Sequence, residues 1–303
     1  MQVVRFRAMN TSVLMAAEGQ GTVRLGMKAA QDFIEASEKR LSRFLPESEL
    51  SRLNRSPGMW VDVSADLLDL LQQSLDFWRE TDGLFDPSIL HDLKRIGYDR
   101  SMDEVRARGD LPTPSASTHR LRPGLDKLEF DSARSRVRLP RGLEVDLGGI
   151  AKGWIVEKAA QLLGAHTEAC AVNAGGDMFF IGHPAEAAKW EVSLEDPRAP
   201  ESMLTALTVA SGAVATSSVR KRAWTQGGQA RHHLIDPRTG ESAQTEWLSV
   251  TVTAPRLATA DVFAKVLLIG GTEAVRLLPP NVSYLAVNEA GEMTGSLEPI
   301  GEL

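Results

Sequence analysis

The octapeptide Asp146-Leu-Gly-Gly-Ile-Ala-Lys-Gly153 places two adjacent glycines between apolar stretches of different periodicity. The alternating pattern over 143–147 predicts a β-strand, and the helical spacing over 150–163 predicts a helix that follows it. Glycines at such a junction let a phosphate approach the backbone, and a helix N-terminus offers N–H groups and partial positive charge. The octapeptide therefore predicts a phosphate-binding turn with Lys152 against a phosphate oxygen. The alternative is a tight turn with a solvated lysine.

Outward from this turn, helical and strand patterns follow one another without strict βαβ alternation. A helix is expected over 23–44, and single strands are expected over 6–15, 169–173 and 232–235. This order favours an α+β architecture over a doubly wound parallel sheet. We expect one domain over 1–303, with the Pro-, Ser-, Arg- and Gly-rich residues 101–124 as a surface excursion.

The charge and composition of the chain exclude several classes of protein. Acidic residues number 40 and basic residues 34, which gives a formal net charge of −6 and argues against nucleic acid as a partner. Cys170 is the single cysteine, so an intramolecular disulfide and a cysteine-cluster metal site are excluded. No apolar run approaches the roughly 20 residues of a membrane helix. The start shows no signal peptide or lipobox, so we expect a cytoplasmic protein without a membrane segment, although an exported form already trimmed would read the same.

Two phenylalanines are candidates for binding a planar ring. Phe44 follows Ser42-Arg43, and Phe85 lies in Gly83-Leu-Phe-Asp-Pro87. The two rings could sandwich the planar group while Asp86 binds its edge. The alternative is that both rings belong to the core, where phenylalanine is more common.

Two further segments carry side chains suited to catalysis. His232 and His233 point to opposite faces of an expected strand, so they cannot bind one metal together. One of them could serve acid–base chemistry near neutral pH, although a lone histidine is more often structural. Asp261, at the start of an expected helix, suits Mg²⁺, which binds one or two carboxylates together with phosphate oxygens. The alternative is an i,i+4 ion pair with Lys265, worth about 0.3–0.5 kcal/mol.

Together, seven segments in chain order resemble the FAD:protein FMN transferase family, the ApbE-type flavin transferases. The segments are Ala8–Thr11, Ser42–Asn54, Gly83–Pro87, Asp146–Gly153, Asn173–Asp177, His233–Pro237 and Ala260-Asp261. Each is weak alone, but the ordered set is specific and covers nearly the whole chain. The resemblance implies a single α+β domain with mixed or antiparallel sheets flanked by helices, and an FAD cleft between two lobes.

The resemblance also implies a reaction. Members transfer FMN from FAD, with Mg²⁺, to a Ser or Thr hydroxyl in the flavinylation motif of an acceptor flavoprotein, and AMP leaves. Two alternatives stay open, an FAD pyrophosphatase that gives FMN and AMP, and a non-catalytic FAD-binding protein.

By the same resemblance, His233 lies at the reacting phosphate, where it deprotonates the hydroxyl or orients the phosphate. Asp261 and the backbone carbonyl of Ala151 hold Mg²⁺. The implied FAD-binding residues are Met9, Phe44, Leu84, Phe85, Asp86, Gly148 and Trp154, to which the turn adds Lys152.

Three departures from the family pattern bear on the site. Met9-Asn-Thr11 replaces Met-Gly-Thr, and Phe44 replaces a common Tyr. Lys265 stands four residues after Asp261, where many members have a metal-binding Thr. We hypothesise that Lys265 reduces the metal coordination and that its ammonium supplies part of the missing positive charge. The alternative is that Lys265 pairs elsewhere and Mg²⁺ binds as usual.

Overall fold

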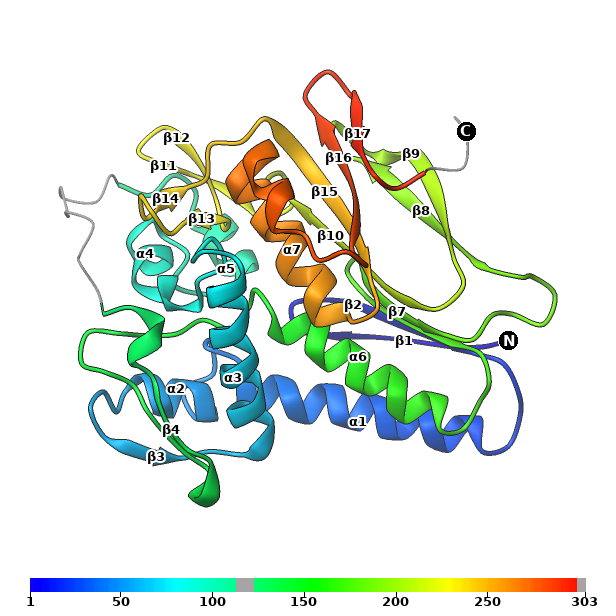
Figure 1. Ribbon diagram of the computed structural model, residues 1–303, viewed down its shortest axis with the longest axis horizontal. Helices are drawn as coiled ribbons and strands as arrows, with labels where there is room; N and C mark the ends of the chain where they lie inside the picture. Colours follow the sequence, from blue (N-terminus) through cyan, green and yellow to red (C-terminus); the bar gives the residue numbers. More distant parts are fainter. Residues whose placement is uncertain (113–122, 299–303) are drawn as a thin grey trace. The chain divides into compact units, whose positions relative to one another are not determined.

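The computed structural model describes residues 1–112 and 123–298 (Figure 1). The chain divides into two compact units, each built from separate stretches of sequence. The first unit comprises Met1–Glu38, Lys152–Ser218 and Thr245–Leu303, and the second comprises Lys39–Ala151 and Val219–Gln244. Of the expected surface excursion over 101–124, residues 113–122 lie outside the described part of the chain. The prediction of one domain over 1–303 stays a prediction, and each unit is described by itself below.

The first unit is built on an eight-stranded sheet of order β1-β2-β6-β7-β10-β15-β16-β17, in which every pair of neighbours is antiparallel. The strands are β1 (Gln2–Ala8), β2 (Thr11–Ala17), β6 (Cys170–Ala174), β7 (Asp177–Ile181), β10 (Gly212–Ser218), β15 (Trp247–Ala254), β16 (Ser283–Asn288) and β17 (Met293–Gly295). A separate ribbon of β8 (Trp190–Asp196) and β9 (Ala199–Val209) packs apolar side chains against Phe180, Val214 and Leu285 of this sheet.

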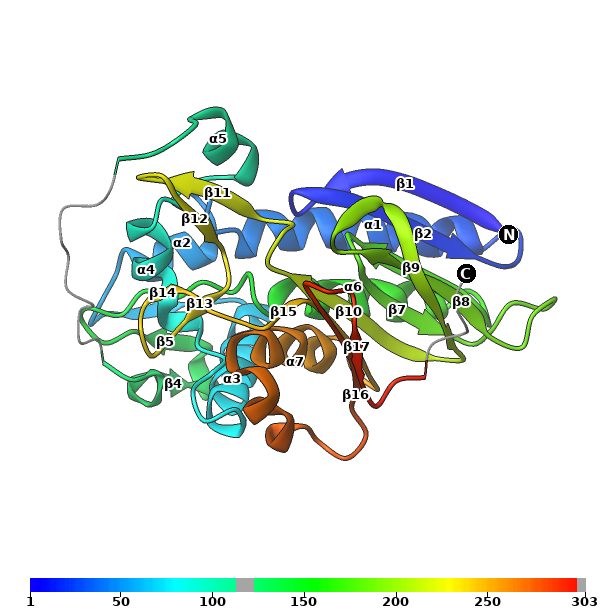
Figure 2. The ribbon, with the colours of Figure 1, turned by 90° about the horizontal axis from the view of Figure 1, so that it is seen from above.

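Helices α1 (Val23–Leu41), α6 (Ala151–Gly164), α7 (Leu257–Gly270) and the 3₁₀ segment η4 (Gly271–Leu277) accompany the sheet. α7 packs against β10 and β15. α6 and α7 run side by side (Figures 1 and 2), and the buried Glu157 of α6 accepts the Leu257 N–H at 2.7 Å. Because Arg256 makes no side-chain cap, this carboxylate satisfies a donor at the start of α7.

The first strand differs from the sequence expectation. A single strand over 6–15 is wrong, because β1 and β2 form a hairpin in which Ala8 pairs with Thr11. Met9 and Asn10 make the turn with φ values of 53° and 55°. Two consecutive positive φ angles are typical of the two-residue hairpin turn that matches strand twist. Asn tolerates this conformation, whereas Met9 is held there at a cost of about 1–2 kcal/mol.

The second unit combines short helices with small antiparallel sheets. Its helices are α2 (Glu49–Asn54), α3 (Ala65–Glu80), α4 (Leu90–Arg95) and α5 (Met102–Ala107), with 3₁₀ turns η1 (Pro87–Ile89), η2 (Leu125–Lys127) and η3 (Ser132–Arg134). Its strands are β3 (Trp60–Asp62), β4 (Glu129–Asp131), β5 (Arg136–Arg138), β11 (Ala223–Gln226), β12 (Gln229–His232), β13 (Ile235–Asp236) and β14 (Glu241–Ser242). The α+β expectation is confirmed.

The stretch before the glycine turn is extended and buried, but the prediction of a strand over 143–147 is wrong. The Val145 N–H donates to Oδ1 of Asn54 at 2.9 Å, and the Val145 carbonyl accepts from Nδ2 of Asn54 at 2.8 Å. The Asp146 N–H donates to the Pro87 carbonyl at 2.7 Å. A side-chain amide therefore takes the place of a neighbouring strand, which satisfies the buried backbone without a ladder.

Candidate functional site

The first unit contains a buried carboxylate at the start of α7. Asp261 has 1 % of its surface exposed. Its Oδ1 forms an ion pair with Nζ of Lys265, and its Oδ2 accepts the Gly153 N–H at 3.2 Å. A Cβ at position 153 would lie 2.8 Å from the Leu257 carbonyl oxygen. Only glycine therefore lets α6 approach α7 closely enough for this hydrogen bond.

A second buried pair lies beside the first. Nζ of Lys152 forms an ion pair with Oδ2 of Asp177, which is 1 % exposed, and donates to the Ala174 carbonyl at 3.4 Å. Asp177 begins β7 directly after a turn in which Oδ1 of Asn173 accepts the Gly176 N–H at 3.0 Å. The turn between β6 and β7 thus fixes the carboxylate that meets the lysine.

These two pairs interact electrostatically. Burial is the main cause that raises the pKa of Asp261 above its usual range, and the negative charge of Asp177 raises it further. The ammonium groups of Lys265 and Lys152 oppose this shift. The four side chains therefore form one group, which we call the Asp–Lys cluster: Lys152, Asp177, Asp261 and Lys265.

Trp154, one turn into α6, belongs to the core of the first unit. It is 1 % exposed, and its ring centroid lies 6.0 Å from that of Phe33 in α1. Nζ of Lys158 lies 5.6 Å from the same ring. The contact with FAD that the resemblance implies for Trp154 stays a prediction.

In the second unit, the glycine turn is tied to its own aspartate. The Gly148 N–H donates to Oδ1 of Asp146, and Oδ2 of Asp146 forms an ion pair with Nε of Arg43 at 2.6 Å. A side chain on Gly148 would place its Cβ 2.8 Å from Oδ1. Asp146 therefore fixes the turn's conformation and occupies the backbone N–H of Gly148, a residue that the resemblance implies for FAD binding.

Arg43 is a residue that sequence reasoning did not single out. Its guanidinium carbon lies 4.1 Å from the ring centroid of Phe44 and 4.7 Å from that of Tyr98. Nη2 is buried without a hydrogen-bond partner. A side-chain cation stacked on two rings is stabilised by their π faces. The adjacency of Arg43 and Phe44 is visible in the sequence, whereas Asp146 and Tyr98 are distant in it.

The two phenylalanines proposed to sandwich a ring have different aromatic partners. Phe44 is half-buried and contacts Tyr98 at a centroid distance of 5.9 Å, and Tyr98 continues to Trp224 at 5.5 Å. Phe85 is only 5 % exposed and meets Phe77 edge-on at 6.2 Å. Phe85 is thus a core residue by its burial, while Phe44 is partly buried and packs against the core cluster that contains Tyr98 and Trp224.

Leu84 and Asp86 flank Phe85 and are both half-buried. Oδ1 of Asp86 accepts the Ser88 N–H at 2.8 Å and the Ser88 hydroxyl at 2.6 Å, so it caps η1. The structural role of Asp86 is therefore to start the turn that carries Pro87, whose carbonyl holds Asp146.

His233 lies between two short ladders, so the prediction of one strand over 232–235 is wrong. β12 ends at His232 and β13 begins at Ile235. The His233 N–H donates to the Arg222 carbonyl at 3.2 Å, and the next residue, Leu234, accepts from Ala243 at 2.9 Å. Separate hydrogen bonds on each side thus fix the backbone at His233.

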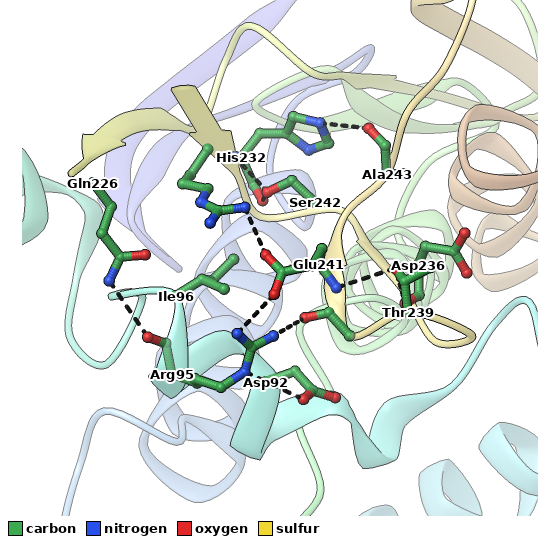
Figure 3. A network of polar contacts seen from close by, with 12 residues as sticks. Asp92, Arg95, Ile96, Gln226, His232, Asp236, Thr239, Glu241, Ser242 and Ala243 are labelled. Carbon is green, nitrogen blue, oxygen red and sulfur yellow. Dashed lines mark hydrogen bonds and ion pairs between the residues drawn. The ribbon is translucent and has the colours of Figure 1, made fainter. Parts of the chain in front are cut away.

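The neighbouring His232 is a structural residue. Its Nε2 lies 3.1 Å from the Ala243 carbonyl, and its backbone N–H and carbonyl both bond to the Ser242 hydroxyl, at 3.0 and 2.8 Å (Figure 3). Burial lowers the pKa of His232 below its usual value. Of the two histidines, His232 is therefore committed to holding the hairpin.

A polar network ties this segment to α4. Glu241 bridges two guanidinium groups, Nη1 of Arg95 at 2.7 Å and Nη1 of Arg231 at 2.6 Å (Figure 3). Nη2 of Arg95 also donates to the Gly240 carbonyl at 2.6 Å. The network fixes β12 and β14, between which His233 lies in the sequence.

A known protein family matches most of this chain. The family model described as "ApbE family" matches residues 9–285. The chain belongs to the ApbE family. A curated relative from Treponema pallidum, named FAD:protein FMN transferase, is 30 % identical over 275 residues, 83 % of this chain and 73 % of that protein. One of the same name from Haemophilus influenzae is 26 % identical over 283 residues, 88 % and 80 % of the two chains.

Solved structures of ApbE proteins share the fold. The ApbE protein from Thermotoga maritima aligns with a TM-score of 0.82 at 27 % identity, over 97 % of this chain and 96 % of that one. The flavin transferase ApbE from Vibrio cholerae aligns with a TM-score of 0.78 at 20 % identity, over 98 % and 96 %. The second likeness concerns the fold alone.

Within this ApbE-family chain, the predicted site residues fall into two sets. The set in the first unit is Met9, Lys152, Trp154, Asp261 and Lys265, and the set in the second is Phe44, Leu84, Phe85, Asp86, Gly148, Ala151 and His233. Within the first set, an ion pair joins Asp261 to Lys265, and the charge of Lys152 acts on Asp261 electrostatically. Across residues 1–112 and 123–298, no helix has the length and apolar character needed to cross a membrane.

Proposed function

We propose that this protein transfers FMN from FAD to a Ser or Thr hydroxyl in the flavinylation motif of an acceptor flavoprotein and releases AMP. The observation that carries the proposal is the relative named FAD:protein FMN transferase, which matches 83 % of this chain at 30 % identity. The family match over 9–285 supports the same reaction, because it includes every predicted site residue.

In this reaction the acceptor oxygen attacks the phosphorus of the FMN half. The bond from that phosphorus to the bridging oxygen breaks, AMP leaves with the bridging oxygen, and the hydroxyl proton passes to a base. Negative charge develops on the phosphoryl oxygens and the leaving AMP, so catalysis depends on positioning and positive charge. Lys152 and the N-terminus of α6 are the groups proposed to meet that charge.

His233 is the residue proposed at the reacting phosphate. A histidine there can take the proton from the acceptor hydroxyl or donate a hydrogen bond to a phosphoryl oxygen. Both roles need a fixed ring, and the backbone on either side of His233 is held by hydrogen bonds to Arg222 and Ala243. The ion pairs of Glu241 with Arg95 and Arg231 further fix the strands that precede and follow His233.

Mg²⁺ is the predicted cofactor, with Asp261 and the Ala151 carbonyl as ligands, and it would supply charge to the phosphoryl oxygens. Both Asp261 oxygens already have partners, the Lys265 ammonium and the Gly153 N–H. Mg²⁺ requires near-octahedral oxygen coordination at about 2.0–2.1 Å, and an ammonium on the same carboxylate repels it. This arrangement does not fit a resident Mg²⁺ ion while Lys265 is in place.

The test is mass spectrometry of candidate acceptor proteins after incubation with this protein, FAD and Mg²⁺. Covalent FMN on a Ser or Thr of the acceptor, with an equal amount of AMP, is the expected result. Rapid AMP and free FMN without an acceptor would instead indicate an FAD pyrophosphatase. Tight FAD binding without AMP for any acceptor would indicate a flavin-binding protein.

A further inference from the structure

The Asp–Lys cluster places four charged groups in a buried site, and their charges balance. It contains two carboxylates, each about 1 % exposed, and two ammonium groups, which pair one to one. Buried charges are tolerated when they are paired and hydrogen-bonded. The two carboxylates and two ammonium groups balance one another, and backbone groups of Gly153, Asp261 and Ala174 add hydrogen bonds, so the cluster is neutral without an added ion.

Sequence spacing does not explain the burial of the Asp261–Lys265 pair. Lys28 and Asp32 in α1 have the same i,i+4 separation and also form an ion pair, but their side chains are 70 % and 54 % exposed. The corresponding exposures of Lys265 and Asp261 are 13 % and 2 %. The same local pairing is therefore a solvated surface contact in α1 and an enclosed one in α7.

Lys265 is held in place by more than one contact. Its Nζ pairs with Oδ1 of Asp261 and donates to the Asp261 backbone carbonyl at 2.9 Å. Gly153 satisfies the remaining carboxylate oxygen from α6. A divalent cation that used Asp261 would have to displace the ammonium and would leave it without a counterion in a buried position, which is costly.

We infer that Lys265 is a built-in cation that takes the place of a divalent metal at Asp261, so that the protein without FAD binds no divalent ion there. This statement depends only on the contacts above. Its extension, that the Lys265 ammonium contributes positive charge to the FAD diphosphate, rests on the proposed function. An ammonium carries half the charge of Mg²⁺ and no open coordination position, so it can attract a phosphate oxygen but cannot be a bridging ligand.

The experiment titrates Mn²⁺ into the full chain without FAD and follows free Mn²⁺ by electron paramagnetic resonance. The wild type is expected to show no saturable site. Lys265→Thr removes the ammonium and adds a hydroxyl oxygen, so we expect Mn²⁺ affinity to rise at least about tenfold, which corresponds to 1.4 kcal/mol. Asp261→Asn in the Lys265→Thr background should abolish that gain. Lys28→Thr, the same change in the exposed pair, should leave the titration unchanged.

Two results would overturn the inference. One is a saturable Mn²⁺ site in the wild type that Asp261→Asn removes. This measurement does not require a substitution at Lys265. The other is a folded Lys265→Thr that binds Mn²⁺ no better than the wild type. If Lys265→Thr fails to fold, Lys265→Gln serves in its place, because it keeps the chain length and offers an amide oxygen without charge. No FAD or acceptor is present, so failure of the proposed transfer reaction would not change these outcomes.

Discussion

Replacing Lys265 by Met removes one charge from the buried pair and keeps most of the side-chain volume. Removing one partner of a buried ion pair costs about 3–5 kcal/mol, because the other charge stays buried without compensation. The matched change Lys28→Met removes one partner of a solvent-exposed ion pair, which contributes little to stability. For a large domain, 1 kcal/mol shifts the melting temperature by roughly 2–4 °C. We therefore expect Lys265→Met to melt at least about 6 °C below the wild type, and Lys28→Met to melt much closer to the wild type.

The pH dependence of this penalty has a defined sign. Burial already raises the pKa of Asp261 above the ordinary value of 3.8, and Lys265 opposes the rise. Without Lys265 the folded-state pKa rises further. A group whose folded pKa exceeds its unfolded pKa contributes stability at low pH and loses it as pH rises through the folded value. The stability difference between Lys265→Met and wild type should thus shrink as the pH is lowered toward 3.8.

Urea unfolding at several pH values measures the effect, and a double-mutant cycle isolates the pair. Asp261→Asn added to Lys265→Met should recover part of the lost stability, because the uncompensated charge is gone. Equal penalties for Lys265→Met and Lys28→Met, or a Lys265→Met penalty that does not change with pH, would refute the buried-pair argument.

Three further predictions concern activity and packing. A chelator should lower the rate of AMP release by the wild type less than about tenfold. It should lower the rate of AMP release by Lys265→Thr about a hundredfold or more, because only the variant depends on a bound ion. Equal losses in the two proteins would contradict this prediction. Gly153→Ala should destabilise the protein by about 1–3 kcal/mol in urea unfolding, because its Cβ would lie 2.8 Å from the Leu257 carbonyl; an unchanged midpoint would disagree. His233→Ala should lower the transfer rate about 10²–10⁴-fold, while its affinity for FAD, measured by fluorescence titration, stays unchanged. Glu241→Gln should lower the rate less, because it only loosens the hairpin. Full activity in His233→Ala would show that His233 takes no part in the reaction.

Local sequence patterns predicted the segments whose contacts are local. Ser64, a residue type favoured at helix N-caps, precedes α3, and its hydroxyl accepts the Leu67 N–H at 3.2 Å. β4 and β5 are close in sequence and pair as an antiparallel hairpin. By contrast, alternation over 143–147 correctly marked buried residues but not their partner, because Asn54 lies 91 positions away. A sequence pattern reports which face is buried and does not report which group satisfies the backbone.

The turn of the β1–β2 hairpin at Met9 and Asn10 is only weakly indicated by the sequence. Asn10 is a residue that tolerates the left-handed conformation, so a turn inside the apolar pattern over 6–15 was readable. Met9 has no such preference, and its positive φ follows from the pairing of β1 with β2. Strain at a residue that the resemblance also places at FAD fits the tendency of functional sites to hold unfavourable backbone conformations.

The sequence names candidate site residues, which stay predictions, but it does not show their electrostatic state. The i,i+4 spacing of Asp261 and Lys265 predicted an ion pair and gave it the small weight of a surface contact. Its burial arises from the approach of Gly153 in α6, which is 108 positions from Asp261. The pair of Lys152 with Asp177 likewise depends on a turn between two strands. Charge placement across separate elements is a tertiary property.

The stretch Asp146–Gly153 now has a different chemical meaning from a vacant phosphate turn. Its Gly148 N–H is bonded to Asp146, and its Lys152 ammonium is paired with Asp177. A diphosphate that binds these groups must therefore exchange one anionic partner for another. Charge-assisted hydrogen bonds to phosphate are strong, but the net gain is only the difference between the two anions. Weakening the internal partner, as in Asp177→Asn, should accordingly tighten the binding of FAD in equilibrium titrations, whereas a loss of affinity would show that Asp177 holds Lys152 in its binding position.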